Sequence, residues 1–181
     1  LNMSNSPNVF LVGAAKAGTT SLWRYLGEHP QIFMTGDHRF KELGYYATDH
    51  GVDNLNEFLS HFKPATKSQI IGDVCNTYLS DTTCAKRILN DVPDAKIIIV
   101  LRNPVDRALS LHNWMVREGY ERVTSFEAAL KEEEVRFASK AFRRNNPHGS
   151  YRNYLYKRSG LYYDQIKTYI DLVPQENLYI E

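Results

Sequence analysis

The chain has 181 residues, of which 43% are hydrophobic and 24% are charged. This balance is typical of one ordinary globular domain and excludes a disordered tail. The 22 Lys and Arg residues almost balance the 21 Asp and Glu residues, which leaves a formal net charge of +1. We therefore expect neither nucleic acid nor an anionic membrane as the main partner. The apolar runs are far shorter than the roughly 20 residues that a membrane-spanning helix needs, so we expect no span in this chain.

Apolar runs and amphipathic stretches alternate along the sequence. In chain order, the patterns predict a strand at 9–12, a helix at 20–29, a strand at 70–74, a helix at 81–90 with Asp81 as its cap, a strand at 96–101, a helix that begins near Pro104, a helix at 162–172 and a strand at 178–180. Strands that alternate with helices need crossover connections, which favour a parallel sheet. The predicted fold is α/β, a three-layer sandwich with a central, mainly parallel sheet, in a single domain over residues 1–181.

The turn after the first strand reads Gly13-Ala14-Ala15-Lys16-Ala17-Gly18-Thr19-Thr20. Small residues between a buried strand and a helix N-terminus let backbone N–H groups surround a phosphate, and the helix dipole adds positive potential. We interpret the turn as a P-loop type of nucleotide-binding loop. In nucleotide triphosphatases Lys directly follows the second Gly, whereas Thr19 follows Gly18 here and Lys16 lies inside the loop. The spacing disfavours a Mg²⁺-dependent triphosphatase, and an ordinary turn with a solvated lysine is the remaining alternative.

Residues 13–22 and 99–110 carry the most specific patterns in the chain. They resemble the 5′-phosphosulfate loop and the 3′-phosphate motif of sulfotransferases that use 3′-phosphoadenosine 5′-phosphosulfate (PAPS). Two such motifs in this order, about 85 residues apart, are more specific than either alone. Lys41-Glu42-Leu43-Gly44-Tyr45-Tyr46 is similar to a Lys-Glu-x-x-aromatic-aromatic segment of carbohydrate sulfotransferases of the heparan sulfate type. Residues 72–79 are similar to their Gly-Glu-x-Ser-Pro-x-Tyr-Leu segment, with Asp73 for the Glu and without the Pro.

The resemblance implies which residues bind the nucleotide donor. They are Ala15, Lys16, Ala17, Gly18, Thr19, Thr20 and Ser21 in the loop, and Arg102 and Ser110 in the second motif. Lys16 is also a catalytic candidate, because an ammonium group on a flexible stem can follow the leaving oxygen as the bond breaks. The alternative role of the loop hydroxyl residues is to cap the following helix. Arg107 competes with Arg102 for the 3′-phosphate, and we expect Arg107 to be mostly structural.

Glu42 is the expected catalytic base, because the matching Glu of the resembling family deprotonates a sugar hydroxyl or amine. Its alternative is a surface carboxylate beside Lys41. Asp73 is the rival catalytic residue, since it follows a buried strand, although an Asp there could equally cap the next turn. No metal is expected, because the six His residues lack metal-ligand spacing and Cys75 and Cys84 form no CxxC pair.

Residues 136–158 contain seven basic residues and no acidic ones, with Tyr151, Tyr154 and Tyr156 interleaved. One interpretation is that they line a cleft for a sugar or anionic acceptor, or contact the nucleotide. The other is a solvated helix face that balances the acidic run Glu132-Glu133-Glu134. The pattern leaves both open.

The resemblance implies transfer of the sulfuryl group of PAPS to a hydroxyl or amine of a saccharide-like acceptor. The alternatives are a small-molecule kinase that uses ATP on a related P-loop fold, and a nucleotide-binding module without turnover. The resemblance also implies a segment after the strand at 178–180, which this sequence does not contain. The two cysteines favour a reducing compartment, so we expect a cytoplasmic location, with a Golgi-lumenal catalytic domain separated from its anchor as the alternative.

Overall fold

The computed structural model describes residues 5–35, 41–49, 51–66, 69–145 and 150–181. Its centre is one five-stranded sheet in the order β2-β3-β1-β4-β5, and every adjacent pair of strands is parallel. The strands are β1 (Val9–Gly13), β2 (Ile32–Met34), β3 (Ile70–Val74), β4 (Lys96–Ile99) and β5 (Leu178–Ile180). The predicted α/β fold with a mainly parallel sheet is confirmed.

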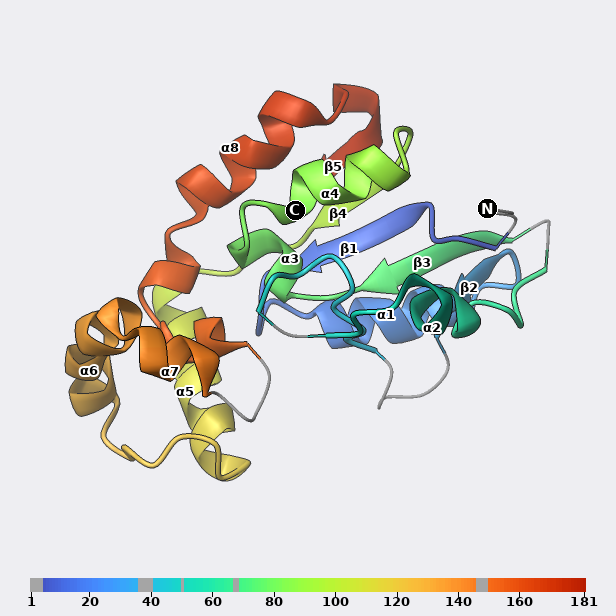
Figure 1. Cartoon of the computed structure of the whole chain (residues 1–181). Coiled ribbons are helices and arrows are strands. Elements are labelled where there is room, and N and C mark those ends of the chain that lie inside the picture. Colours follow the sequence, from blue (N-terminus) through green and yellow to red (C-terminus); the bar gives the residue numbers. More distant parts are fainter. Residues whose placement is uncertain (1–4, 36–40, 50, 67–68, 146–149) are drawn as a thin grey trace.

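Helices cover both faces of the sheet, as Figure 1 shows. On one face, α1 (Thr19–Gly27) packs Trp23 into a small core that also contains Leu11 of β1. The larger core on the other face contains Phe10 and Val12 of β1. The helices that contribute to it are α2 (Leu55–Ser60), α3 (Thr77–Ser80), α4 (Cys84–Asp91) and α8 (Tyr162–Leu172). β1 lies in the middle because its unbroken apolar run is covered on both faces, which confirms the three-layer prediction.

A group of helices lies beyond the carboxyl ends of the strands (Figure 1). We call it the helical lobe, and it consists of α5 (Pro104–Arg117), α6 (Phe126–Ala138), α7 (Lys140–Arg144) and the 3-10 helix η2 (Tyr151–Tyr154). The lobe has its own apolar cluster, which includes Leu111 and Met115 of α5. Two further 3-10 helices, η3 (Arg158–Gly160) and η4 (Gln175–Asn177), precede α8 and β5. The lobe therefore packs as a second core beside the sheet.

The helix predicted at 81–90 differs most from the structure. α4 begins at Cys84 with Thr83 as its N-cap, so the prediction that Asp81 caps this helix is wrong. Asp81 instead ends α3, and its carboxylate accepts hydrogen bonds from the N–H groups of Thr83 at 3.1 Å and Thr48 at 3.0 Å. The bond from Thr48 ties a second loop to the end of α3. The patterns in the sequence did not indicate β2, α2, α3, α6 and α7. No helix within the described ranges combines the length and hydropathy that a bilayer crossing requires.

Candidate active site

A cavity of about 650 Å³ lies where the carboxyl ends of β1, β3 and β4 face the helical lobe. Open α/β sheets bind ligands at this edge, and the volume is within the range of small-molecule sites. The cavity is lined by Ala15, Lys16, Gly18, Thr19, Thr20, Lys41, Glu42, Asn76, Thr77, Arg102, Ser110, Leu111, Trp114, Ser150 and Asn153. A second hollow of about 320 Å³ shares Lys16, Arg102, Ser110 and Trp114 and extends along α5 to Arg117.

Two glycines shape the loop between β1 and α1. Gly13 has a φ of 151°, and a Cβ atom added there would lie 2.7 Å from the Cβ of Leu79. Gly18 has a φ of 97° and is the N-cap of α1. Lys16 has a φ of 66°, a left-handed conformation that is strained for a residue other than glycine and clusters at functional sites. The loop thus brings the Lys16 side chain and the N-terminus of α1 to one cavity.

Lys16 lies in a positively charged corner of the cavity. Its pKa is lowered first by burial and next by the charges of Arg117 and Arg102. Its Nζ lies 5.4 Å from the centroid of the Trp114 ring, and Arg102 Nη1 donates to its backbone carbonyl oxygen at 3.3 Å. A bound anion would relieve the repulsion among these cations, so the corner favours a phosphate-type group.

Arg102 and Ser110 lie at the same cavity, on either side of the start of α5. The Arg102 carbonyl oxygen accepts a hydrogen bond from the Tyr162 hydroxyl at 3.0 Å. Asn103 caps α5 with its side chain and Pro104 is the first helical residue, both of which are typical of helix starts. This fixed start sets the rotation of α5, which places Ser110 two turns later at the cavity.

Arg107 does not line the cavity. Its side chain is fully buried, and Nη2 donates to the carbonyl oxygen of Tyr156. Burial lowers the pKa of its guanidinium group. Arg107 joins α5 to the segment after η2, which agrees with the structural role expected of it.

Glu42 lines the cavity, and three donors hold its carboxylate. Lys41 Nζ contacts Oε1, Asn76 Nδ2 donates to Oε1 at 3.1 Å, and the Asn76 N–H group donates to Oε2 at 2.7 Å. The Glu42 side chain is 32% exposed, whereas the Lys41 side chain is only 7% exposed. Glu42 is therefore a fixed carboxylate that a ligand can contact, and not a solvated surface residue.

Asp73 lies behind the cavity wall. Its carboxylate is buried, Oδ2 accepts a hydrogen bond from the Tyr78 hydroxyl at 2.9 Å, and Oδ1 has no hydrogen-bond partner in the described part of the chain. Burial, together with the nearby charge of Glu42, raises the pKa of Asp73 to about 7. The structure thus places Glu42, and not Asp73, at the cavity surface.

We expect the variant Asp73→Asn to be more stable than the wild type at about pH 8 and nearly equal to it at about pH 4. In the unfolded chain the Asp73 carboxyl has the ordinary pKa of 3.8, but in the fold it ionises only near 7. The wild type therefore loses stability as the pH rises between these values, by roughly 1.4 kcal/mol per unit of difference, and the uncharged amide does not. Thermal unfolding across this pH range measures the effect. A constant difference in Tm at every pH would contradict it.

The cavity unites most of the predicted site residues and leaves out three. Ala17, Ser21 and Asp73 do not line it. The cavity also has lining residues that were not predicted from the sequence, namely Lys41, Asn76, Thr77, Leu111, Trp114, Ser150 and Asn153. Two of these had a signal in the sequence: Asn76 follows a strand at its carboxyl end, and Trp114 lies one helical turn after Ser110.

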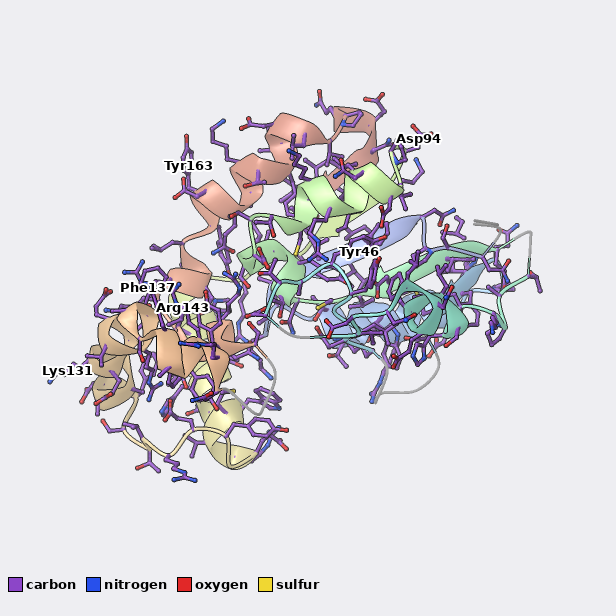
Figure 2. The ribbon with its side chains drawn as sticks, viewed as in Figure 1. Tyr46, Asp94, Lys131, Phe137, Arg143 and Tyr163 are labelled. Carbon is purple, nitrogen blue, oxygen red and sulfur yellow. The ribbon has the colours of Figure 1, made fainter. Side chains whose placement is uncertain are left out.

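The basic segment 136–158 contacts partners within the protein. The contacts are Arg136 with Glu121, Arg152 with Asp49 and Asp81, Arg158 with Glu134, and Arg143 with the ring of Phe137. Figure 2 labels Phe137 and Arg143 close together on the helical lobe. Glu133 is fully buried, and its carboxylate accepts hydrogen bonds from the backbone N–H groups of Lys157 and Arg158, at 2.7 and 2.9 Å. None of these arginines lines the cavity, although Ser150 and Asn153 of the same segment do. Lys140, Arg143 and Arg144 are exposed on α7 and Arg158 pairs with Glu134 of the acidic run, so each interpretation describes a part of the segment.

Comparisons with known proteins agree with this geometry. The sequence profile described as "Sulfotransferase domain" matches residues 6–180. The crystal structure of a sulfotransferase from Alicyclobacillus acidocaldarius has a TM-score of 0.84 and 32% identity, over 96% of this chain and 72% of that one. The membrane-associated sulfotransferase kil1 of Dictyostelium discoideum is 32% identical over 114 residues, which are 61% of this chain and 23% of that protein.

A second curated relative is the bifunctional heparan sulfate N-deacetylase/N-sulfotransferase 1 of Homo sapiens. It is 28% identical over 109 residues, which are 58% of this chain and 12% of that protein. The chain thus matches less than a quarter of the length of either curated relative. The profile covers nearly all of the chain, and the parallel sheet is shared with a solved member, so this chain belongs to the sulfotransferase family.

Proposed function

We propose that this chain transfers the sulfuryl group of PAPS to a hydroxyl or amine of a saccharide-like acceptor. The observation that supports the proposal is a single cavity that brings together Lys16, Arg102, Ser110 and Glu42. The cations and the N-terminus of α1 suit the two phosphate ends of the nucleotide. The Glu42 carboxylate suits the acceptor, whose proton it can take.

Each of these side chains has a distinct part in the proposed reaction. The acceptor O–H or N–H bond breaks as a bond to sulfur forms, and the bond between sulfur and the phosphate oxygen breaks with its electron pair on that oxygen. Glu42 takes the proton, and Lys16 stabilises the charge on the leaving oxygen. Arg102 and Ser110 hold the 3′-phosphate. Positioning and electrostatics supply most of the acceleration, as in phosphoryl transfer, and the cations make a metal unnecessary.

The remaining lining of the cavity supports a saccharide-like acceptor. It includes the half-buried ring of Trp114 and the neutral polar residues Asn76, Thr77, Ser150 and Asn153. Sugars present hydroxyl groups that hydrogen-bond to such side chains, and C–H faces that pack on an aromatic ring. A single domain over residues 1–181 and a cytoplasmic location stay predictions.

Binding of two nucleotides tests the proposed donor. We expect 3′-phosphoadenosine 5′-phosphate (PAP), the product of PAPS, to raise Tm, and ATP with Mg²⁺ to have little effect. A ligand at 100 times its Kd adds about 2.7 kcal/mol to the stability, which is readily measured. A response to ATP with Mg²⁺ alone would support the kinase alternative. Stabilisation by PAP without any turnover of PAPS would support the binding module.

The variant Arg102→Ala is expected to weaken PAP binding much more than binding of adenosine 5′-phosphate, which lacks the 3′-phosphate. A charge-assisted contact made by only one of two ligands contributes roughly 1.5 to 3 kcal/mol, or about 10- to 100-fold in Kd. Calorimetric titration of both nucleotides measures the difference. Equal losses would show that Arg102 serves the fold instead.

A further inference from the structure

We infer that Asn76 is a positioning residue for the proposed base, and that it leaves Glu42 Oε2 as the atom that takes the acceptor proton. This inference rests on the proposed function. It assigns a role to a residue outside the two phosphate motifs, and it names one of two carboxylate oxygens.

The hydrogen bonds at the carboxylate distinguish its two oxygens. Oε1 accepts from Lys41 Nζ and from Asn76 Nδ2, at 3.1 Å for the latter. Oε2 accepts from the Asn76 N–H group at 2.7 Å, its one hydrogen bond within the described residues. An ionised carboxylate oxygen has about two acceptor positions. Oε1 is therefore fully used, and Oε2 keeps one lone pair for the incoming proton.

Asn76 is itself attached to the rigid part of the fold. It is the N-cap of α3, directly after Cys75, whose N–H group donates to the Leu11 carbonyl oxygen of β1 at 3.2 Å. Both Cys75 and Thr77, on either side of Asn76, are buried. Glu42 lies on a segment without regular secondary structure. The two bonds from Asn76 thus hold its carboxylate at a fixed position relative to the sheet.

The two hydrogen bonds from Asn76 to Glu42, which we call the clamp, depend on the residue type at position 76. Asn supplies a backbone donor and a side-chain donor in one position, and the two reach different oxygens of the same carboxylate. The similar Gly-Glu-x-Ser-Pro-x-Tyr-Leu segment has Pro here, which has no N–H group and no side-chain donor. The clamp is therefore a property of this chain's own sequence at residue 76.

The test is a double-mutant cycle between Asn76 and Glu42. Asn76→Ala removes the Nδ2 donor, and we expect it to slow PAP formation from PAPS by about 10-fold or more at unchanged PAP affinity, because misplaced reacting groups lose rate and not binding. The rate is measured with a panel of sugar acceptors and with water alone. In the Glu42→Gln background, the same change should alter the rate less than about twofold. Asn56→Ala, an exposed change on α2, is the matched control.

A second variant guards against a loss of folding. Asn76→Asp keeps the shape of the side chain, but it sets a carboxylate against Glu42, so its rate loss should be at least as large as that of Asn76→Ala. Equal rate losses in the wild-type and Glu42→Gln backgrounds would overturn the inference, as would an unchanged rate in both Asn76 variants.

The free protein supplies a readout that needs no donor. The decreases in Tm caused by Asn76→Ala and Glu42→Ala should be less than additive, because each removes the same bond. Additive decreases would overturn the clamp. If PAP did not stabilise the wild type, the proposed function would fail. The Tm values of Asn76→Ala, Glu42→Ala and the double variant would still decide whether the clamp exists.

Discussion

The variant Glu42→Gln should transfer sulfuryl groups about 10²- to 10⁴-fold more slowly than the wild type, the usual effect of losing a general base. The amide keeps the size of the side chain and its one oxygen can still accept a hydrogen bond from Asn76, but it cannot take a proton. Donor binding should be nearly unchanged, since the residues proposed to bind the donor lie in the loop after β1 and in α5 and the loop before it. Single-turnover rates at saturating PAPS, with PAP affinity measured in parallel, separate the two quantities.

Two variants control this result. Glu132→Gln makes the same chemical change on an exposed part of α6 and should leave the rate unaltered. Asp73→Asn tests the rival carboxylate. If Asp73→Asn abolished transfer without a loss of stability while Glu42→Gln were nearly silent, the base would be Asp73.

For Lys16→Ala, the expected loss of transfer rate is about 10²- to 10³-fold, as for removal of one donor that stabilises a developing oxyanion. The loss of donor affinity should be smaller, because the Lys16 charge is most effective when the leaving oxygen becomes negative. The neighbouring charges of Arg102 and Arg117 remain to attract the donor. Rate and affinity are measured as for Glu42.

The control for this variant is Lys131→Ala, an exposed change on the helical lobe that Figure 2 labels. It removes the same ammonium group far from the loop in sequence and should change neither quantity. A loss confined to donor affinity in Lys16→Ala would make Lys16 an ordinary phosphate ligand of the ground state.

The inner strands of the central sheet were predictable because burial on both faces demands unbroken apolar runs, whereas the edge strand β2 was missed. The runs in β1 and β4 could be identified from the sequence for this reason. α6 could not be identified from the sequence, because its buried face includes Glu133 and Arg136, which have partners in other segments of the chain. A charged side chain in a sequence is typical of an exposed position, and only tertiary contacts show that these two are paired and buried.

The site was predictable where its residues follow a fixed spacing. Lys16, Arg102 and Ser110 belong to local strand–loop–helix units, whose geometry is set by neighbours in sequence. Ser150 and Asn153 reach the cavity because the chain returns from the helical lobe, which no local pattern encodes. The contact between Glu42 and Asn76 spans 34 residues and depends on how two loops meet.

The order of the strands has a consequence for how the protein is made. Val9 of β1 pairs with Gly72 on one side and Lys96 on the other, and the Ala14 N–H group donates to the Val100 carbonyl oxygen at 2.7 Å. A ribosome adds about 5 to 20 residues per second, so β1 is synthesised seconds before either partner strand. Until residue 100 has left the ribosome, the nascent loop after β1 lacks the contacts that give it its shape. The nucleotide proposed above would therefore stabilise this protein only after both strands that flank β1 have been synthesised.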